Sequence, residues 1–183
     1  EVLAHTQNRG YGGNQKTLYN RVKELPCDVV AMVHPDNQYD TTCIKDAVQM
    51  IIDNKADMVL GTRMMTAKKL GMPWWKRGGN RLLSTVQRRV FRTHLSEFHS
   101  GLRIFRASLL SEMPYETFSD DFVFDSQFLA WCFGHKKNIR EVPTRCFYRP
   151  DVSSINLRRS MKYGLATLRV LLSYRFGTRY RNL

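Results

Sequence analysis

Two short apolar segments separated by a helical pattern constrain the fold of this chain more than any other feature. Residues 28–33 and 57–60 are apolar runs bounded by turn residues, as is typical of strands buried on both faces. Between them, four apolar residues recur at helical spacing: Ile44, Val48, Ile51 and Ile52. A strand, a helix and a strand joined by a crossover of about two dozen residues form a βαβ unit, which requires parallel strands and a right-handed connection. The sequence therefore predicts an α/β fold with a parallel sheet.

Further elements are predicted around this unit. A glycine-rich turn over residues 9–14 leads into a helix over residues 15–23. Thr41 or Thr42 is expected to cap the helix that carries Ile44. Downstream, the pattern predicts helices over 80–91, 108–114 and 119–134, and strands over 100–105, 139–142 and 145–148. Because Pro143 cannot donate a hydrogen bond within a ladder, the last two strands are expected at an edge.

The composition of the 183 residues favours one globular domain. Hydrophobic residues make up 43% of the chain, which argues against disorder, collagen and coiled coils. The four cysteines lack CxxC spacing, so a zinc ribbon is disfavoured and reduced, buried thiols are expected. No apolar stretch reaches the roughly 18 residues needed to span a bilayer, and no signal peptide is recognised. Because Glu1 opens in the middle of a pattern, we expect a piece of a longer protein.

The chain is strongly basic, with a formal net charge of +13, and residues 156–183 hold seven Lys and Arg residues but no acidic residue. Apolar residues at helical spacing line the same stretch: Leu157, Met161, Leu165, Leu168, Leu171 and Leu172. A basic amphipathic helix is typical of a membrane surface, but the same pattern fits a helix packed on the domain with a solvated basic face. We therefore divide the chain into a domain over residues 1–155 and a basic amphipathic helix over residues 156–183.

Polar residues follow the first predicted strand directly. Ligands of open parallel sheets gather at the carboxyl ends of strands, so His34, Asp36 and Gln38 are the first candidates for a site. An imidazole, a carboxylate and an amide oxygen at alternate positions form a set that can hold a divalent cation together with substrate phosphates and water. A polar loop without a ligand fits the same residues.

Five short motifs follow one another along the chain: Asn8–Lys16, His34–Tyr39, Gly61–Arg63, Ser100–Arg103 and Glu141–Pro143. In this order they resemble family 2 glycosyltransferases, and more narrowly the dolichyl- and polyprenyl-phosphate mannosyl- or glucosyltransferases and their bacterial relatives. The resemblance runs from Asn8 to about Asn156. It implies a GT-A fold, which is Rossmann-like, a nucleotide-sugar donor, a divalent cation (Mg²⁺ or Mn²⁺) and inversion at the anomeric carbon.

The resemblance also implies a set of site residues. His34, Asp36 and Gln38 match an Asp-x-Asp-x-Gln element that binds the cation, with histidine in place of the first aspartate; a neutral imidazole suits Mn²⁺ better than Mg²⁺. Glu97 lies where the family has an acidic residue that would orient the acceptor or accept a proton, and Arg103 would face phosphate groups beside it. The remaining residues matched to donor or acceptor binding are Gly61, Arg63, Ser100, Gly101 and Arg149.

Family members begin with strands that hold the base and ribose of the donor, and these do not precede Glu1, so we expect a GT-A fold that is incomplete at its amino terminus. The predicted function is inverting glycosyl transfer from a nucleotide-sugar to a polyprenyl phosphate. The enzyme would be peripheral at the cytoplasmic inner face of the membrane and attracted to its anionic surface. A catalytically inactive, interaction-only relative is one alternative. A nucleic-acid-binding module is another, but no RRM, KH, helix-turn-helix or zinc signature supports a nucleic-acid partner.

Overall fold

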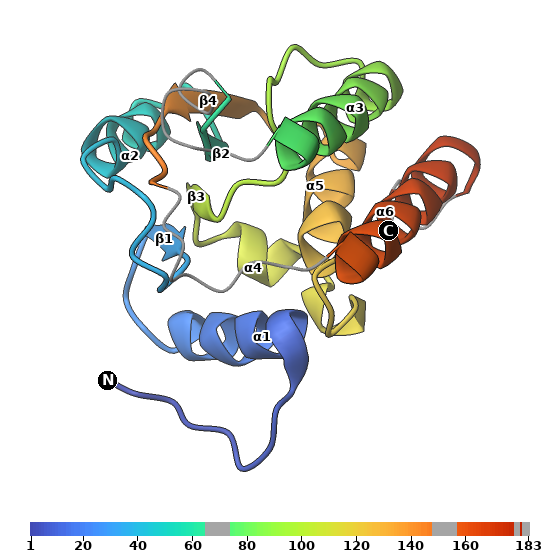
Figure 1. Cartoon of the computed structure of the whole chain (residues 1–183). Helices are drawn as coiled ribbons and strands as arrows, with labels where there is room; N and C mark the ends of the chain where they lie inside the picture. Colours follow the sequence, from blue (N-terminus) through green and yellow to red (C-terminus); the bar gives the residue numbers. More distant parts are fainter. Residues whose placement is uncertain (65–73, 148–156, 178–179, 181–183) are drawn as a thin grey trace.

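The computed structural model describes residues 1–64, 74–147, 157–177 and 180. Within them a four-stranded sheet has the order β1-β3-β2-β4 (Figure 1). Its strands are β1 (Val29–Val33), β2 (Met58–Thr62), β3 (Leu102–Arg106) and β4 (Ile139–Pro143). Each coincides with a predicted apolar run, shifted by at most a few residues. The α/β fold class is therefore confirmed.

The pairing of the strands differs from the prediction. β3 lies between β1 and β2 and is antiparallel to both, with Ala31 opposite Ile104 and Val59 opposite Ile104. Among the described strands, only β2 and β4 pair in parallel, with Leu60 opposite Glu141. The sheet is thus mixed and the predicted parallel sheet is wrong: β1 and β2 run in the same direction, but β3 separates them. β1 pairs on one side only within the described residues, and the side chain of Ala31 is exposed, so β1 is not buried on both faces.

Helices cover both faces of the sheet. α2 (Ile44–Ile52) packs on one face, where Ala47 and Ile51 meet Val59 and Ile104. The other face carries a larger, aromatic-rich core beneath the remaining helices. These are α1 (Gly10–Lys23), α3 (Trp74–Phe91), α4 (Leu109–Glu112), α5 (Phe124–Gly134) and α6 (Leu157–Phe176), and a 3₁₀ turn spans Tyr115–Thr117. The result is three layers, helix on sheet on helices (Figure 1).

Three local predictions need correction. The glycine-rich segment is not a turn before the helix, because α1 begins at Gly10. A Cβ atom on Gly12 would lie 2.1 Å from the carbonyl oxygen of Ser119, so glycine there permits close approach of the two backbones. Cys43, not a threonine, precedes α2, and no side chain caps that helix. Arg145 and its neighbours form no second edge strand within the described residues, where only an isolated bridge between Tyr39 and Cys146 occurs.

α6 joins the core without using all of its apolar residues. Thr167, Val170, Leu171 and Tyr174 are buried, and the helix packs against α5 and α3. Leu171 is the one buried member among those residues of the predicted apolar face whose side chains are described. No helix of the described residues is long and apolar enough to cross a membrane. All four cysteines are free, but only Cys132 and Cys146 are buried as expected; Cys43 is half-buried and Cys27 is exposed.

Candidate functional site

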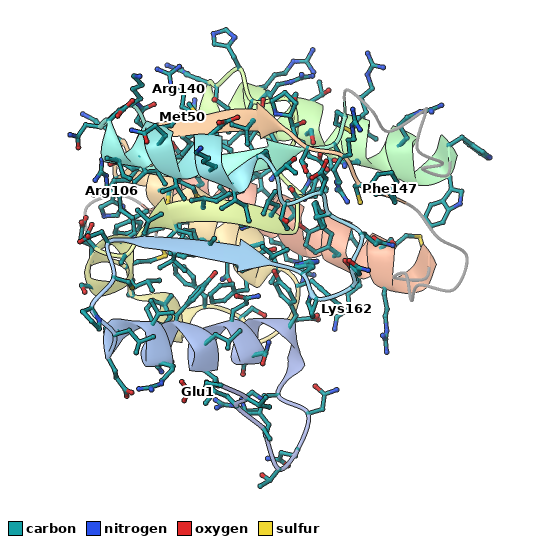
Figure 2. All side chains as sticks on the ribbon, turned by 90° about the vertical axis from the view of Figure 1, so that its left-hand side faces the viewer. Glu1, Met50, Arg106, Arg140, Phe147 and Lys162 are labelled. Atoms are coloured by element: carbon teal, nitrogen blue, oxygen red, sulfur yellow. The ribbon has the colours of Figure 1, made fainter. Side chains whose placement is uncertain are left out.

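The loops at the carboxyl ends of β1 and β2 meet the turn that leads into β3. The backbone N–H of His34 donates to the carbonyl of Gly101 (3.0 Å), and the N–H of Gly101 donates to the hydroxyl of Tyr39 (2.7 Å). After β2, Thr62 contacts Ser96 through their hydroxyl groups (2.8 Å). Figure 2 shows this end of the sheet at the arrowhead of β1, with Phe147 beside it and Arg106 at the opposite end. Three of the predicted motifs therefore lie together at one end of the sheet, where β1 and β2 finish and β3 begins; we call this end the site edge of the sheet.

Glu97 is completely buried at the site edge and is paired with Arg63. Its carboxylate accepts hydrogen bonds from the Arg63 backbone N–H (2.7 Å), from Arg63 Nε (2.8 Å) and Nη2, and from Asn80 Nδ2 (2.9 Å). Burial by itself would raise the pKa of this carboxyl, but the charge and hydrogen bonds of Arg63 outweigh it and hold the pKa below its usual range. Glu97 is therefore a carboxylate whose oxygens are already engaged, which suits it to positioning Arg63.

A second carboxylate binds the backbone next to Glu97. Glu141 on β4 accepts hydrogen bonds from the backbone N–H and the hydroxyl of Ser96 (2.8 and 3.0 Å) and from the N–H of Glu97 (2.9 Å). The Glu141–Pro143 motif by itself predicts no role for Glu141. Its place in the structure is the anchor that fixes the backbone next to Glu97.

Arg103 points into the protein from β3 and is 2% exposed. Its guanidinium pairs with Asp125 of α5 (2.9 Å) and donates to the carbonyl of Ser100 (3.2 Å). Burial raises the pKa of Asp125, and the charge of Arg103 opposes this rise by stabilising the carboxylate. Arg103 thus stabilises the Ser100–Gly101 turn through the Ser100 carbonyl, and Asp125 of α5 is the counter-ion of Arg103.

Asp125 is connected to the predicted cation loop by hydrogen bonds through Tyr11. The Tyr11 hydroxyl donates to Asp125 Oδ2 (3.0 Å) and lies 3.0 Å from Nε2 of His34. Burial lowers the pKa of His34, which favours the neutral imidazole near pH 7. Sequence reasoning missed Tyr11, although it lies in the first motif, and gave Asp125 no role. No local signal links them, since 114 positions separate the two residues.

The predicted cation ligands in the loop after β1 already have partners. Asp36 Oδ1 accepts the backbone N–H of Gln38 (3.0 Å), and Asn37 between them has a left-handed backbone (φ 53°). The amide oxygen of Gln38 lies 3.9 Å from the Cys146 sulfur. Among the described residues no group of three or more His, Cys, Asp or Glu side chains is arranged to hold a metal ion by itself. A carboxylate, an amide oxygen and one imidazole nitrogen fit a hard divalent cation that also takes phosphate and water oxygens, and the nitrogen favours Mn²⁺.

The other predicted site residues lie in different settings. Gly61 is inside β2, and a Cβ atom on it would lie 2.8 Å from Leu102, so its role in the structure is close packing. Ser100 and Gly101 form the turn itself. Arg149 lies outside the described residues.

Comparison with known sequences agrees with this geometry. Residues 1–113, more than half of the chain, match the family described as Glycosyl transferase family 2. The UDP-N-acetylglucosamine–dolichyl-phosphate N-acetylglucosaminyltransferase of Methanococcus voltae is 29% identical over 148 residues, which are 80% of this chain and 59% of that protein. The low-salt glycan biosynthesis hexosyltransferase Agl6 of Haloferax volcanii is 25% identical over 85% of this chain and 37% of its own length. The chain thus spans less than two thirds of these relatives.

Among solved structures, glucosyl-3-phosphoglycerate synthase from Mycobacterium tuberculosis, in complex with Mn²⁺, UDP and phosphoglyceric acid, superposes with a TM-score of 0.65. The superposition covers 95% of this chain and 56% of that one, at 13% identity. At this identity the similarity concerns the fold alone. It confirms the GT-A fold and agrees with the expectation that the fold present here is incomplete.

Proposed function

This chain belongs to glycosyltransferase family 2, and on that premise we propose that it transfers a sugar, with inversion, from a nucleotide-sugar to a polyprenyl phosphate. The observation that carries the proposal is the convergence of the His34 loop, Arg63 and the Ser100–Gly101 turn at the site edge of the sheet. Ligands of open α/β sheets bind at such an edge. The dolichyl-phosphate acceptor in the name of the Methanococcus voltae relative supports the acceptor class.

The engaged state of Glu97 fits a phosphate acceptor. The oxygen of a lipid phosphate is already anionic near neutral pH, so its attack on the anomeric carbon needs no strong general base. Catalysis then depends on position and charge, which is the task for which Glu97 holds Arg63 in place. We assign Arg63 to phosphate binding, and also Arg149, which is not among the described residues. Ser100 and Gly101 would border the donor, and Arg103 would hold their turn.

Asp36, Gln38 and His34 would hold the divalent cation. When bound, Mn²⁺ or Mg²⁺ would neutralise the charge that develops on the departing nucleoside diphosphate. Asp36 is the carboxylate of this set, so it should contribute most to the affinity for a hard cation. The Asp36→Asn substitution is therefore expected to abolish Mn²⁺-dependent transfer and to leave the melting temperature unchanged.

The matched control for this test is Asp46→Asn, an exposed aspartate on α2. Transfer would be measured with a radiolabelled nucleotide-sugar and a short polyprenyl phosphate, in the complete protein, over a Mn²⁺ titration. Retention of wild-type transfer by Asp36→Asn would overturn the cation assignment. Loss of transfer in both variants would point to a general defect instead.

An exposed apolar and basic surface on α6 and α3 supports the lipid acceptor. On α6, Met161, Leu165 and Leu172 are more than half exposed, and basic residues lie between them. On α3, which packs against α6, Trp74 and Leu82 are also largely exposed. Apolar side chains with interspersed Lys and Arg favour an anionic bilayer, where each basic residue near the surface adds about 1 kcal/mol. We propose that this surface lies on the inner face of the cell membrane, with the cytoplasm on the side of the sheet.

Vesicle co-sedimentation tests this surface. The double substitution Leu165→Glu and Leu172→Glu should reduce binding to vesicles that contain anionic lipid, and so should changing Arg158, Arg159 and Lys162 together to Gln. Ile52→Glu on α2 is the matched control, because Ile52 is as exposed as Leu172 (59% each) but lies across the sheet. Equal binding to neutral and anionic vesicles, or an equal loss in the Ile52 variant, would overturn the proposal.

A further inference from the structure

The Tyr11 hydroxyl is the centre of a hydrogen-bond chain that the proposed function does not use. A hydroxyl carries one proton, and that of Tyr11 is donated to the carboxylate of Asp125. The contact between Tyr11 and His34 must then run the other way, with Nε2–H of the imidazole donating to the hydroxyl oxygen (3.0 Å). Arg103 fixes the far end of the chain by its ion pair with Asp125 (2.9 Å). These hydrogen bonds therefore assign the proton of neutral His34 to Nε2.

The ring of His34 is also held in place by its neighbours. A Cβ atom on Gly101 would lie 2.4–2.7 Å from three atoms of the ring, Nδ1, Cγ and Cε1, so one face of the imidazole rests on the glycine. Tyr11 and Tyr39 contact the ring in edge orientation, with centroid distances of 5.4 and 6.3 Å. Tyr11 is in turn stacked on Phe122 (5.3 Å, 22°). Neither His34 nor Tyr11 can turn without breaking several of these contacts.

We propose that Tyr11 is a positioning residue for the cation site: it fixes His34 with the proton on Nε2 and so leaves the Nδ1 lone pair for a divalent cation held with Asp36. A histidine that binds a metal through one nitrogen usually donates the N–H of the other to an acceptor, which fixes its tautomer and orientation. Here the acceptor is a tyrosine hydroxyl held by a buried Asp–Arg pair. The inference rests on the proposed function in that it takes the cation site at His34 and Asp36 as given.

The tautomer can be measured without metal or substrate. In ¹⁵N-histidine-labelled protein, long-range proton–nitrogen spectra distinguish an Nε2–H from an Nδ1–H imidazole. His34 of the wild type should show the Nε2–H pattern, and Tyr11→Phe should lose it in favour of a mixture. Tyr19→Phe is the matched control, because Tyr19 lies on the same helix and is buried, but takes no part in the hydrogen bonds that link Asp125, Tyr11 and His34. An Nδ1–H pattern in the wild type would overturn the inference at once.

The second readout is Mn²⁺ affinity, measured by titration calorimetry at fixed pH. Loss of an outer partner of a metal-binding histidine typically weakens affinity about 10- to 100-fold, so Tyr11→Phe should raise the Kd by that factor and Tyr19→Phe should leave it unchanged. If Asp36→Asn weakens binding but Tyr11→Phe does not, the cation site stands and the role of Tyr11 is refuted. If neither variant changes the Kd, the cation site itself falls, and the inference falls with it.

Discussion

Two buried ion pairs flank the Ser100–Gly101 turn, and they differ in where their hydrogen bonds lead. We call the Arg63–Glu97 pair closed, because its fully buried carboxylate accepts side-chain hydrogen bonds from Arg63 and Asn80, which lie at the same end of the sheet. Arg103–Asp125 is open: the arginine is buried, but the carboxylate is 13% exposed and continues through Tyr11 to His34. The closed pair stabilises the end of the sheet where the motifs meet. The open pair is connected by hydrogen bonds to His34 and so helps to fix the candidate cation loop.

The cost of burying charge explains why both pairs are complete. A buried carboxylate without a partner loses several kcal/mol of hydration that nothing replaces. The difference between the pairs lies in what remains when one partner is removed. Among the described residues, Glu97 would keep Asn80 alone as a side-chain donor, but Asp125 would keep Tyr11 and some contact with water. Four measurements test this comparison.

The largest effect is expected for Arg63→Met, which leaves Glu97 buried without its cation. The free energy of unfolding should fall by about 3–5 kcal/mol in urea denaturation at pH 7. Arg140→Met, an exposed change on β4, should cost far less. Adding Glu97→Leu to Arg63→Met should recover part of the loss, because it removes the unpaired charge. A loss below about 1 kcal/mol for the single variant would show that the closed pair does not stabilise the site edge.

Arg103→Met should cost less, about 2–4 kcal/mol, because Tyr11 and water still reach Asp125. Unlike Arg63→Met, it should also change the ¹⁵N shifts of the His34 ring, since it releases the end of the hydrogen-bond chain. Denaturation and the histidine spectra would be compared for both variants. If Arg63→Met disturbs His34 as much as Arg103→Met does, the distinction between a closed and an open pair is lost.

Acidification should weaken the region between the two pairs through His99. Burial, aided by the charges of Arg63 and Arg103, lowers the pKa of His99 to about 3. The unfolded chain, with an ordinary histidine pKa near 6.5, therefore binds more protons between pH 6.5 and 3, and stability falls as pH falls through this window. The slope is at most about 1.4 kcal/mol per pH unit, or up to about 2 kcal/mol by pH 5. Denaturation curves from pH 7 to 5 should show a flatter dependence for His99→Gln; identical slopes would contradict the assignment.

The smallest effect is expected at an exposed pair, which serves as the reference. Lys162 and Asp121 lie 3.1 Å apart, but their side chains are 78% and 50% exposed. Lys162→Met should lower the free energy of unfolding by less than about 1 kcal/mol, and added salt should remove the difference. A loss as large as that of Arg103→Met would mean that burial does not separate strong pairs from weak ones here.

The sequence by itself determined the local elements. Val29–Val33 and Met58–Thr62 read as strands and Ile44–Ile52 as a helix because hydrophobic periodicity is a local property of the chain. The sequence also placed the His34 loop and Arg63 in one site, because residues that follow strands gather at the ends of a sheet. The resemblance to family 2 added the Ser100–Gly101 turn.

Only the tertiary structure decided which of these elements and side chains meet. Nothing in the periodicity of residues 102–106 says that β3 inserts between β1 and β2 and runs antiparallel to both. The family resemblance likewise suggested that Glu97 orients the acceptor or accepts a proton, but its four hydrogen bonds appear only once Arg63 and Asn80 fold beside it. Tyr11 and Asp125 carry no shared local signal, and their contact exists because α1 and α5 pack on the same face. Local pattern specifies backbone and burial, whereas partners are chosen by packing between distant segments.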